Sequence, residues 1–367
     1  MINDQEYITT KLKKTLEKMI ILSAPRLNNL IAMVIGIICS QSVVLSKISQ
    51  ELKDNYSLGT EESKIKRLQR FLSNEAINPE KLYEFFTYKL LQKYKFKSKS
   101  IYIIFDHTTI DDRFVILQFS LKIGKRAVPL WFKLFKYKQD GNKDFIHVKE
   151  GLTFLHKVLK PYEFDVTILA DRGFKSIDLF KFIDEELKWK YCIRCTKDLS
   201  IFIDGKNKIK KLDDILPKKG GSKHFYNIKL TSQDICKALD AEDTWFIANN
   251  LSEPYAIREY KKRFDIEEMF KDFKSTGFNL EDTWSNNIHY AKMLYFCVCI
   301  AYTYIISLGI SCSKDKKNKL LGSVKNINGN KVRIYSLFTT GMKWFKRCYY
   351  SCRKKYYLKT CFTLYSN

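Results

Sequence analysis

Several signatures of common enzyme classes are missing from this sequence of 367 residues. It has no P-loop and no nucleophile elbow, and its five histidines are scattered along the chain. Acidic residues are also scarce, because 40 Asp and Glu stand against 65 Lys and Arg, which gives a formal net charge of +25. Such an excess of positive charge favours a polyanionic partner. Nucleic acid is the usual one, and an anionic membrane is the alternative.

The ten cysteines do not form the pattern of a disulfide-stabilised protein. They are scattered through a long chain without a signal peptide, and we therefore expect a reducing cytoplasm. Cys192 and Cys195 have metal-like spacing, but residues three apart in a strand face opposite sides of the sheet. Because no second pair lies at a useful distance in the sequence, we expect no zinc there.

Two apolar runs bear on whether the chain crosses a membrane. Residues 30–45 are short and are interrupted by Ser40, Gln41 and Ser42. Residues 293–310 approach spanning length, but they contain Tyr, Thr and Ser side chains and follow a helix expected to be soluble. We therefore expect a buried core helix at 293–310 and no membrane partner.

The pattern of apolar residues divides the chain into five regions. Helical spacing prevails up to residue 98 and strand-like runs follow. We expect a helical N-terminal DNA-binding region at 1–98, the first part of an α/β core at 99–187, a β-rich insertion at 188–251, the second part of the core at 252–310 and a basic C-terminal tail at 311–367. The element order predicts a mixed α/β sheet that carries an inserted β module.

The predicted tail holds about half of the surplus positive charge. Residues 311–367 contain 14 Lys and Arg and one acid. Aromatic residues alternate with the bases in the stretch WFKRCYYSCRKKYY, a composition that suits contact with phosphates and stacking on bases. A loosely ordered basic tail is the alternative.

Two aspartates follow the strongest strand signals. Asp106 comes directly after the apolar run IYIIF, and Asp171 comes directly after FDVTILA. Continuous apolar runs are typical of buried parallel strands, and sites in such sheets gather at the carboxyl ends of the strands. An acid at the end of one strand is common, but the two together predict a pair of neighbouring carboxylates.

A helix is predicted between residues 252 and 277. Ser252 would be its N-cap, Glu253 and Pro254 would lie in its first turn, and Gly277 would end it.

At about 100° per residue, this helix carries one narrow polar stripe, made of Tyr260, Arg263, Glu267 and Lys274. Glu268 and Asp272 are expected to face solvent instead. A solvated helix face with ion pairs would show the same stripe, so the stripe alone leaves that alternative open.

Three of these acids can converge. Asp106 and Asp171 would meet Glu267 if the helix packs beside the sheet, and three carboxylates without His or Cys suit hard cations such as Mg²⁺. Two such ions about 3.5–4 Å apart can activate a water or a 3′-hydroxyl and stabilise the leaving oxygen of a phosphodiester.

At this point the residues carry a family resemblance. The chain resembles DDE transposases of bacterial insertion sequences, in the branch marked by a Tyr-x2-Arg-x3-Glu-x6-Lys signature. The polar stripe matches the full spacing of that signature. FDHTT at 105–109 resembles the first-Asp motif of the family and LADRGF at 169–174 resembles the second, so the resemblance covers roughly residues 20–310.

The resemblance implies a fold, a catalytic set and partners. It implies an RNase H-like core in which Asp106, Asp171 and Glu267 are catalytic and hold two Mg²⁺ ions, for which Mn²⁺ can substitute. The implied DNA-binding residues are Tyr260, Arg263, Lys274 and Trp245. The implied partners are double-stranded DNA, as terminal inverted repeats and target, and a second copy of the chain on paired ends, in a bacterial cytoplasm near the nucleoid.

Trp245 lies in TWFIANNLSEP, shortly before the signature helix. In this branch an aromatic residue of the insertion can stack on a base flipped from the duplex, and Trp245 stands where that residue is expected. A tryptophan packed inside the insertion is the alternative.

Other functions remain compatible with the sequence. An inactive copy could occupy transposon ends and repress transposition, and a metal-dependent nuclease could cut DNA without joining it. A cleavage assay separates the first from a transposase, and strand-transfer products separate the second.

Overall fold

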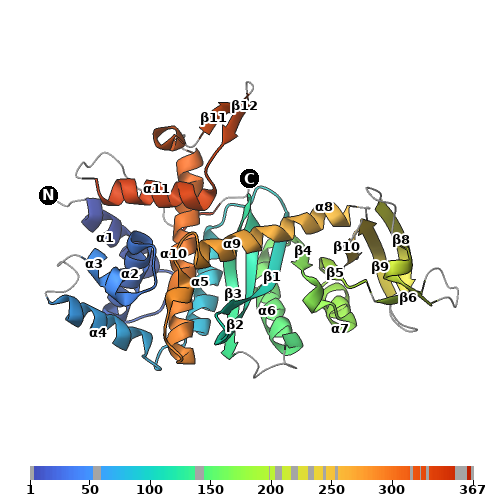
Figure 1. Ribbon diagram of the computed structural model, residues 1–367, viewed down its shortest axis with the longest axis horizontal. Coiled ribbons are helices and arrows are strands. Elements are labelled where there is room, and N and C mark those ends of the chain that lie inside the picture. The colour runs from blue at the N-terminus through green and yellow to red at the C-terminus, as the bar shows by residue number, and fades with distance from the viewer. Residues whose placement is uncertain are drawn as a thin grey trace.

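The computed structural model describes residues 4–52, 59–136, 144–197, 199–202, 209–215, 222–229, 235–242, 245–252, 255–314, 317–322, 324–327, 330–351 and 362–364. The long helix α10 (Ile288–Lys314) stands between two parts of the molecule. The first four N-terminal helices lie on one side of it, and a long sheet extends from the other (Figure 1).

The N-terminal region is helical, as the periodicity predicts. Its helices are α1 (Asp4–Leu16), α2 (Ala24–Ser40), α3 (Leu45–Glu51), α4 (Glu61–Leu72) and α5 (Pro79–Lys93). Side-chain caps begin two of them: Thr60 accepts a hydrogen bond from the backbone N–H of Ser63 at 3.3 Å, and Asn78 accepts one from Lys81 at 3.0 Å. Helix α2 is apolar on most sides because it contacts α1, α3, α4 and α10.

Within the described residues, ten strands form one sheet in the order β3-β2-β1-β4-β5-β10-β9-β8-β6-β7. Its first three strands make an antiparallel meander: β1 (Ser100–Ile110), β2 (Phe114–Ile123) and β3 (Arg126–Lys136). On its other side β1 pairs in parallel with β4 (Asp165–Ala170), and β4 pairs in parallel with β5 (Lys190–Cys195). The prediction of a mixed α/β sheet is confirmed.

The predicted insertion continues the same sheet. Strand β5 falls inside 188–251, yet it is the parallel neighbour of β4. The strands beyond it pair antiparallel and form the far end of the sheet: β10 (Trp245–Asn249), β9 (Ile235–Glu242), β8 (Ser222–Lys229), β6 (Ser200–Phe202) and β7 (Ile209–Lys211). The β-rich segment therefore extends the core sheet sideways (Figure 1).

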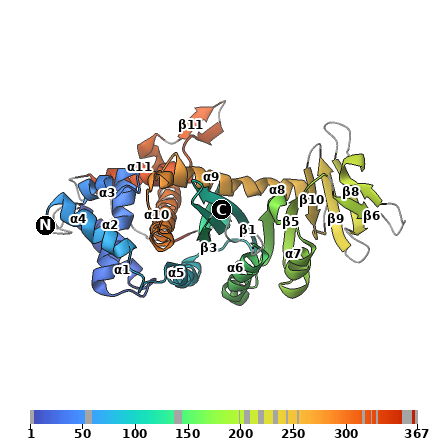
Figure 2. The same cartoon turned by 60° about the horizontal axis from the view of Figure 1, so that its bottom comes forward.

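Helices cover both faces of the sheet. Figure 2 shows α5, α6 (Asp144–Leu159) and α7 (Ile177–Lys181) below it, and α8 (Ala256–Tyr260) and α9 (Phe264–Lys274) above it. A π-helical turn, Phe182–Glu186, continues α7. Short 3₁₀ turns lie at Lys160–Tyr162, Arg172–Phe174, Leu212–Ile215, Lys261–Arg263, Leu280–Asp282 and Lys317–Leu321.

The helix predicted from residue 252 begins later and is interrupted. It starts at Ala256 with Tyr255 as the N-cap, and the 3₁₀ turn Lys261–Arg263 divides it into α8 and α9. Ser252 is not the cap, because the side chains of Asn249 and Asn250 hold the preceding segment extended: Asn249 accepts from Leu251 N at 3.2 Å, and Asn250 donates to the carbonyl of Trp189 at 3.0 Å. Glu253 and Pro254 lie outside the described residues.

Helix α10 is the central core element. It is the one single helix in the described ranges that is long and apolar enough to span a membrane, and its most apolar window is fully buried inside the protein. Helices α2 and α3 pass the same test only when taken together, and they meet at 95°. The predicted core helix at 293–310 is confirmed.

Part of the predicted basic tail is packed structure. Helix α11 (Leu337–Tyr349) contacts α10, and the two backbones approach so closely that a Cβ atom at Gly309 or Gly341 would collide with the backbone of the other helix. The two-stranded sheet of β11 (Val324–Ile327) and β12 (Asn330–Arg333) projects away from the body (Figure 1).

Candidate active site

Asp106 and Asp171 lie at the same level of the sheet, Asp106 within β1 and Asp171 directly after β4. β1 and β4 pair in parallel with Phe105 opposite Ala170, and each of these two residues is followed directly by one of the aspartates. β1 does not end at Asp106, as its apolar run suggested, because β2 keeps pairing with it as far as Ile110. The parallel pairing with β4 does end there, as predicted for a pair of neighbouring carboxylates.

Residues from α8 and α9 reach both aspartates. Arg263 donates from Nη1 to Asp106 Oδ2 at 2.8 Å and from Nη2 to Glu267 Oε1 at 2.5 Å. The hydroxyl of Tyr260 donates to Asp171 Oδ1 at 3.1 Å. The three predicted carboxylates and two predicted phosphate-binding residues thus meet in one group, the site cluster, made of Asp106, Asp171, Tyr260, Arg263 and Glu267.

Burial shapes the electrostatics of the site cluster. It raises the pKa of Asp106 to about 6, although the Arg263 charge and the His107 backbone N–H, 2.9 Å from Oδ1, favour the ionised form. The charges of Asp171 and Glu267 raise this pKa further. Burial, aided by the charge of Asp171, also raises the pKa of Tyr260, so its hydroxyl remains a donor at neutral pH. A bound cation would relieve this crowding of negative charge.

Arg263 is the least satisfied member of the site cluster. Its side chain is 6% exposed, and its Nε atom is buried without a hydrogen-bond partner among the described residues. Glu267, in contrast, is 42% exposed and faces solvent. Leaving a buried N–H unpaired costs about 1–3 kcal/mol, so this arrangement is not optimised for stability alone.

The carboxylates fit a hard divalent cation in their chemistry, because all of them offer oxygen donors. In the described part of the chain, however, no three His, Cys, Asp or Glu side chains are arranged around a common metal position. The guanidinium of Arg263 occupies two of the candidate ligands instead. A metal could therefore be admitted once Arg263 releases Asp106 and Glu267.

Lys274 lies apart from the site cluster. Its ammonium group pairs with Glu281 at 2.9 Å, in the 3₁₀ turn that follows α9. The polar stripe is therefore split: its first three residues join the aspartates, and its fourth does not. The 3₁₀ turn at 261–263 and the late start of the helix do not explain why Lys274 lies apart, because α9 is continuous from Glu267 to Lys274.

Trp245 is half-buried beside the site cluster. Its ring meets the ring of Tyr260 at 5.6 Å, edge to face, and that of Phe264 at 5.7 Å. Two cations lie near the same ring, with Lys261 Nζ at 5.7 Å and the Arg194 guanidinium at 6.0 Å from its centroid. Trp245 is thus packed on one side against the signature segment, at the start of β10.

Sequence reasoning missed Phe264 and Arg194 as neighbours of the site. Phe264 is 38% exposed and directly follows Arg263, so its position beside the signature was a visible signal. Arg194 gave no such signal, because it reaches Trp245 through the pairing of β5 with β10. Cys192 and Cys195 lie in the same β5 strand, and both are buried.

Asp272 was expected to face solvent, and that expectation is wrong. It is 4% exposed and accepts hydrogen bonds from Arg126 Nε at 2.9 Å, Thr276 at 3.2 Å and Tyr302 at 3.3 Å. Burial raises the pKa of Asp272 to about 6 against the opposing effect of Arg126. These four residues, here called the anchor cluster, fix α9 to β3 and α10. Glu268 is 41% exposed, as expected, and pairs with Lys271 at 2.7 Å.

Comparison with known proteins gives one family. Residues 148–304 match the transposase DDE domain, a region that includes Asp171 and the whole signature but not Asp106. No curated protein sequence matches the chain.

Among solved structures, the Argonaute protein of Marinitoga piezophila, in complex with a 5′-OH guide RNA and target DNA, matches at 14% identity and a TM-score of 0.26. The match covers 68% of this chain and 37% of the Argonaute chain. No inference about fold or function follows from so low a similarity. The transposase DDE match, over a region that contributes four of the five residues of the site cluster, supports a DDE transposase family for this chain.

Proposed function

We propose that the protein is a transposase that cleaves DNA at the ends of an insertion sequence and joins those ends to target DNA. One observation carries the proposal: Asp106, Asp171 and Glu267 meet around Arg263 and Tyr260, in a chain whose residues 148–304 match the transposase DDE domain. The mixed sheet is compatible with an RNase H-like nuclease core, which is the fold we assign.

In this proposal Asp106, Asp171 and Glu267 are the metal ligands and catalytic residues. Two Mg²⁺ ions, or Mn²⁺ in their place, would supply Lewis-acid stabilisation and lower the pKa of the attacking water or 3′-hydroxyl. The protein itself would hold the three carboxylates on three separate backbone segments. Because these segments keep the carboxylates from moving apart, bound cations would offset the repulsion between them.

In this proposal the cationic and hydroxyl side chains of the signature bind phosphates. Arg263 would exchange its two carboxylate partners for a phosphate of the transposon end, because the two N–H groups that now donate to separate carboxylates can both donate to one phosphate. Tyr260 would donate its protonated hydroxyl, and Lys274 would contribute a point charge after leaving Glu281. Trp245 would offer a stacking surface to a flipped base, supported from behind by Tyr260 and Phe264.

The proposal also names partners and place. Double-stranded DNA is the substrate, as terminal inverted repeats and as target, and two copies of the chain would act on paired ends. Because its proposed substrate is chromosomal DNA, the protein would be located in the bacterial cytoplasm, at the nucleoid.

The test starts from the DNA that flanks the gene. The full chain is incubated with Mg²⁺ or Mn²⁺, a linear fragment that carries both flanking ends and a supercoiled target plasmid. Cleavage at the ends and covalent joining to the plasmid are read on a denaturing gel. We expect nicks at the boundaries of inverted repeats and joined products that duplicate a short target sequence.

Other outcomes contradict the proposal in distinct ways. Cuts without joined products would indicate a nuclease. Specific binding without cuts, under conditions in which the protein is folded and metal is present, would indicate a repressor.

A further inference from the structure

Trp284 is the most exposed large hydrophobic side chain in the part of the chain that the structure describes, at 91% of its full accessible surface. The other tryptophans differ from it: Trp131, Trp189 and Trp344 are buried, and Trp245 is half-buried. Single exposed hydrophobic residues are common on protein surfaces. The exposure of Trp284 is therefore informative only together with the way its ring is held and the place where it lies.

Arg113 holds the backbone on both sides of Trp284. Its Nη1 donates to the carbonyl of Ser285 at 3.0 Å, and its Nη2 donates to the carbonyl of Thr283. The same guanidinium pairs with Asp111 at 2.6 Å. The indole is thus carried on a fixed backbone, so a ligand that covers it has little backbone to order, and the entropic cost of binding is reduced.

The segment that carries Trp284 lies between two elements of the candidate active site. On one side, Glu281 pairs with Lys274, the last residue of the signature, at 2.9 Å. On the other side, Arg113 belongs to the turn after β1, the strand that contains Asp106. From the site cluster it is about 10 Å along α9 to Lys274 and about 13 Å along β1 to the end of that strand. A DNA strand held at the site cluster can therefore reach this segment within a few nucleotides.

The acidic side chains of this segment and of the adjoining turn form ion pairs. The pairs join Glu281 to Lys274 at 2.9 Å, Asp282 to Lys47 at 3.8 Å and Asp111 to Arg113 at 2.6 Å. Because each pair largely cancels its own charge, these acids do not present a free negative surface that would repel a phosphate backbone. The chain as a whole carries a net charge of +25, which attracts a polyanion.

We propose that the indole face of Trp284 stacks on an unpaired base of a DNA strand beside the site cluster. The inference rests on the proposed function, in that DNA is the substrate. In an intact duplex the bases show only their edges in the grooves, because their faces are stacked on one another. Cleavage of a strand lets bases beside the cut leave the stack. An exposed indole can receive any of the four bases, because each has a π face.

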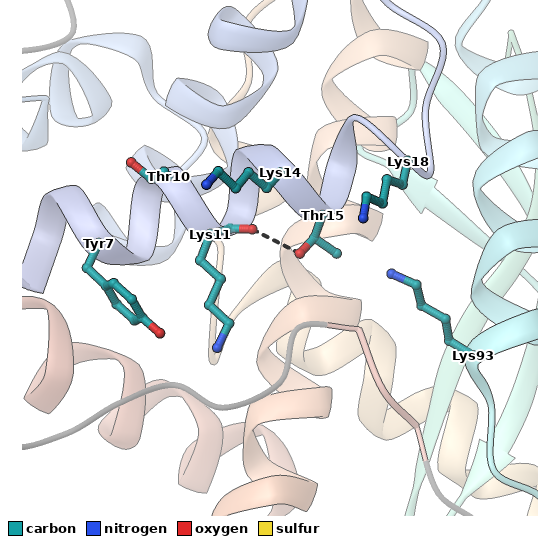
Figure 3. A pocket seen from close by; sticks show the side chains of 7 residues that line it. All are labelled: Tyr7, Thr10, Lys11, Lys14, Thr15, Lys18 and Lys93. Atoms are coloured by element: carbon teal, nitrogen blue, oxygen red, sulfur yellow. Dashed lines mark hydrogen bonds between the residues drawn. The ribbon is translucent and has the colours of Figure 1, made fainter.

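The groove between α1 and α5 offers a different chemistry. It encloses about 470 Å³ and is lined by Tyr7, Thr10, Lys11, Lys14, Thr15, Lys18 and Lys93 (Figure 3). Its lysines offer charge, as expected for a DNA-binding N-terminal region, whereas Trp284 offers an aromatic face. Charge acts on the phosphates of any DNA, and stacking acts only on a base whose face is free. The two features therefore predict different responses to the form of the DNA.

The first experiment compares two fluorescein-labelled probes, a blunt duplex and the same duplex with a single-stranded tail of about eight nucleotides. The full chain is used with a chelator and no divalent metal, so binding is measured without cleavage. The test variants are Trp284→Ala and Trp284→Phe. The control is Tyr88→Ala, which removes an aromatic ring, 42% exposed, from α5 on the opposite face of the sheet from α9 (Figure 2).

Loss of one base–aromatic stack should weaken binding of the tailed duplex about 5- to 150-fold. Binding of the blunt duplex should change less than about twofold, because its bases are already stacked. Trp284→Phe keeps a ring and should retain most of the affinity for the tailed duplex. Tyr88→Ala should bind both probes as the unaltered protein does.

The second experiment uses the unaltered protein, so it does not depend on the folding of a variant. Among the five tryptophans only Trp284 has an open ring, and acrylamide quenching of the intrinsic fluorescence therefore reports mainly on it. The tailed duplex should remove most of the fluorescence that acrylamide can reach, and the blunt duplex should remove much less. Trp284→Phe should lack this accessible fraction without DNA.

The failures can be told apart. If neither probe binds, DNA is not the substrate, and the proposed function falls together with this inference. If both probes bind and Trp284→Ala behaves like Tyr88→Ala, only the role of Trp284 falls. Equal weakening of both probes would overturn stacking on an unpaired base. Protection from acrylamide that increases with protein concentration in the absence of DNA would show that a second copy of the chain covers the ring, and it would also overturn the inference.

Discussion

Helix α9 connects two clusters that use the same chemistry in different ways. The site cluster joins Arg263 to two carboxylates, and the anchor cluster joins Arg126 to Asp272. In the anchor cluster the carboxylate receives an arginine, a threonine and a tyrosine donor, and its side chain is 6% exposed. In the site cluster one arginine N–H is buried without a hydrogen-bond partner among the residues that the structure describes, and Glu267 is 42% exposed.

Under the proposed function, the difference separates a group that fixes the fold from one that is held ready for a ligand. In the anchor cluster Asp272 already accepts three hydrogen bonds, so its buried carboxylate has little capacity left for another partner. In the site cluster the Arg263 Nε–H is buried without a partner among the described residues, the Glu267 carboxylate reaches solvent, and two carboxylates share a single arginine. We infer that the anchor cluster positions α9 so that the site cluster can exchange its partners without moving the helix.

The sharpest test of this difference removes carboxylates from each cluster. Asp106→Asn, Asp171→Asn and Glu267→Gln should each lower Mg²⁺-dependent cleavage at least about 1,000-fold, because each removes a proposed metal-binding charge worth several kcal/mol in the transition state. Duplex binding, measured by fluorescence anisotropy, should change little. Glu268→Gln, one residue along the helix, should cut normally.

Near-normal cleavage by any one of these three variants, once shown to be folded, would remove that residue from the catalytic set. Loss of cleavage in Glu268→Gln would mean that the exposed face of α9, rather than the site cluster, carries the chemistry.

The free energy of unfolding should depend more on the anchor cluster than on the site cluster, which is the reverse of the effect on cleavage. Arg126→Gln leaves Asp272 buried without its cationic partner, and breaking a buried pair in this way costs about 3–5 kcal/mol. Arg263→Gln should cost less, because water can reach Glu267. Urea unfolding followed by circular dichroism measures both. Equal losses would mean that the site cluster contributes to stability as the anchor cluster does.

The sequence predicted which residues of the site cluster lie together better than it predicted the anchor cluster. Apolar runs that end in Asp106 and Asp171 report buried strands directly, and the spacing of Tyr260, Arg263 and Glu267 reports one helical face. Those signals are local and periodic. The anchor cluster is not local, because Arg126 and Asp272 lie 146 residues apart and meet only when α9 packs on β3. Helical periodicity alone therefore assigned Asp272 to solvent.

Strand pairing and the interruption of the signature helix could not be predicted from the sequence for similar reasons. The alternation in β5 is the same whether its neighbour is parallel or antiparallel, so residues 190–195 were assigned to the insertion rather than to the core sheet. Residues 344–349, the first part of the basic, aromatic stretch, form the end of α11, and their composition fits either a tail or a packed helix. The 3₁₀ turn at 261–263 has no mark in the sequence, because Lys and Arg suit a helix equally well.

A pH profile can isolate the anchor cluster. The pKa of Asp272 is about 6 in the fold, against about 3.8 in the unfolded chain, so the fold favours the protonated carboxyl. The stability this gives is complete below about pH 4 and is lost as the pH rises to about 6, by up to about 3 kcal/mol. The stability of the protein relative to Asp272→Asn should fall over that interval. A flat difference would mean that Arg126 cancels the effect of burial.

The smallest expected effect concerns the exchange of partners in the site cluster. Arg263→Gln removes the cation that competes for Asp106 and Glu267, so Mn²⁺ should bind about fivefold more tightly in the absence of DNA, as expected for an ion pair worth about 1 kcal/mol. Electron paramagnetic resonance of free Mn²⁺ measures this without any cleavage. Arg263→Lys keeps the charge and should bind Mn²⁺ much as the unaltered protein does, whereas Asp106→Asn should bind it poorly. Weaker Mn²⁺ binding by Arg263→Gln would show the opposite role, in which the arginine aligns the carboxylates for the metal instead of holding their place.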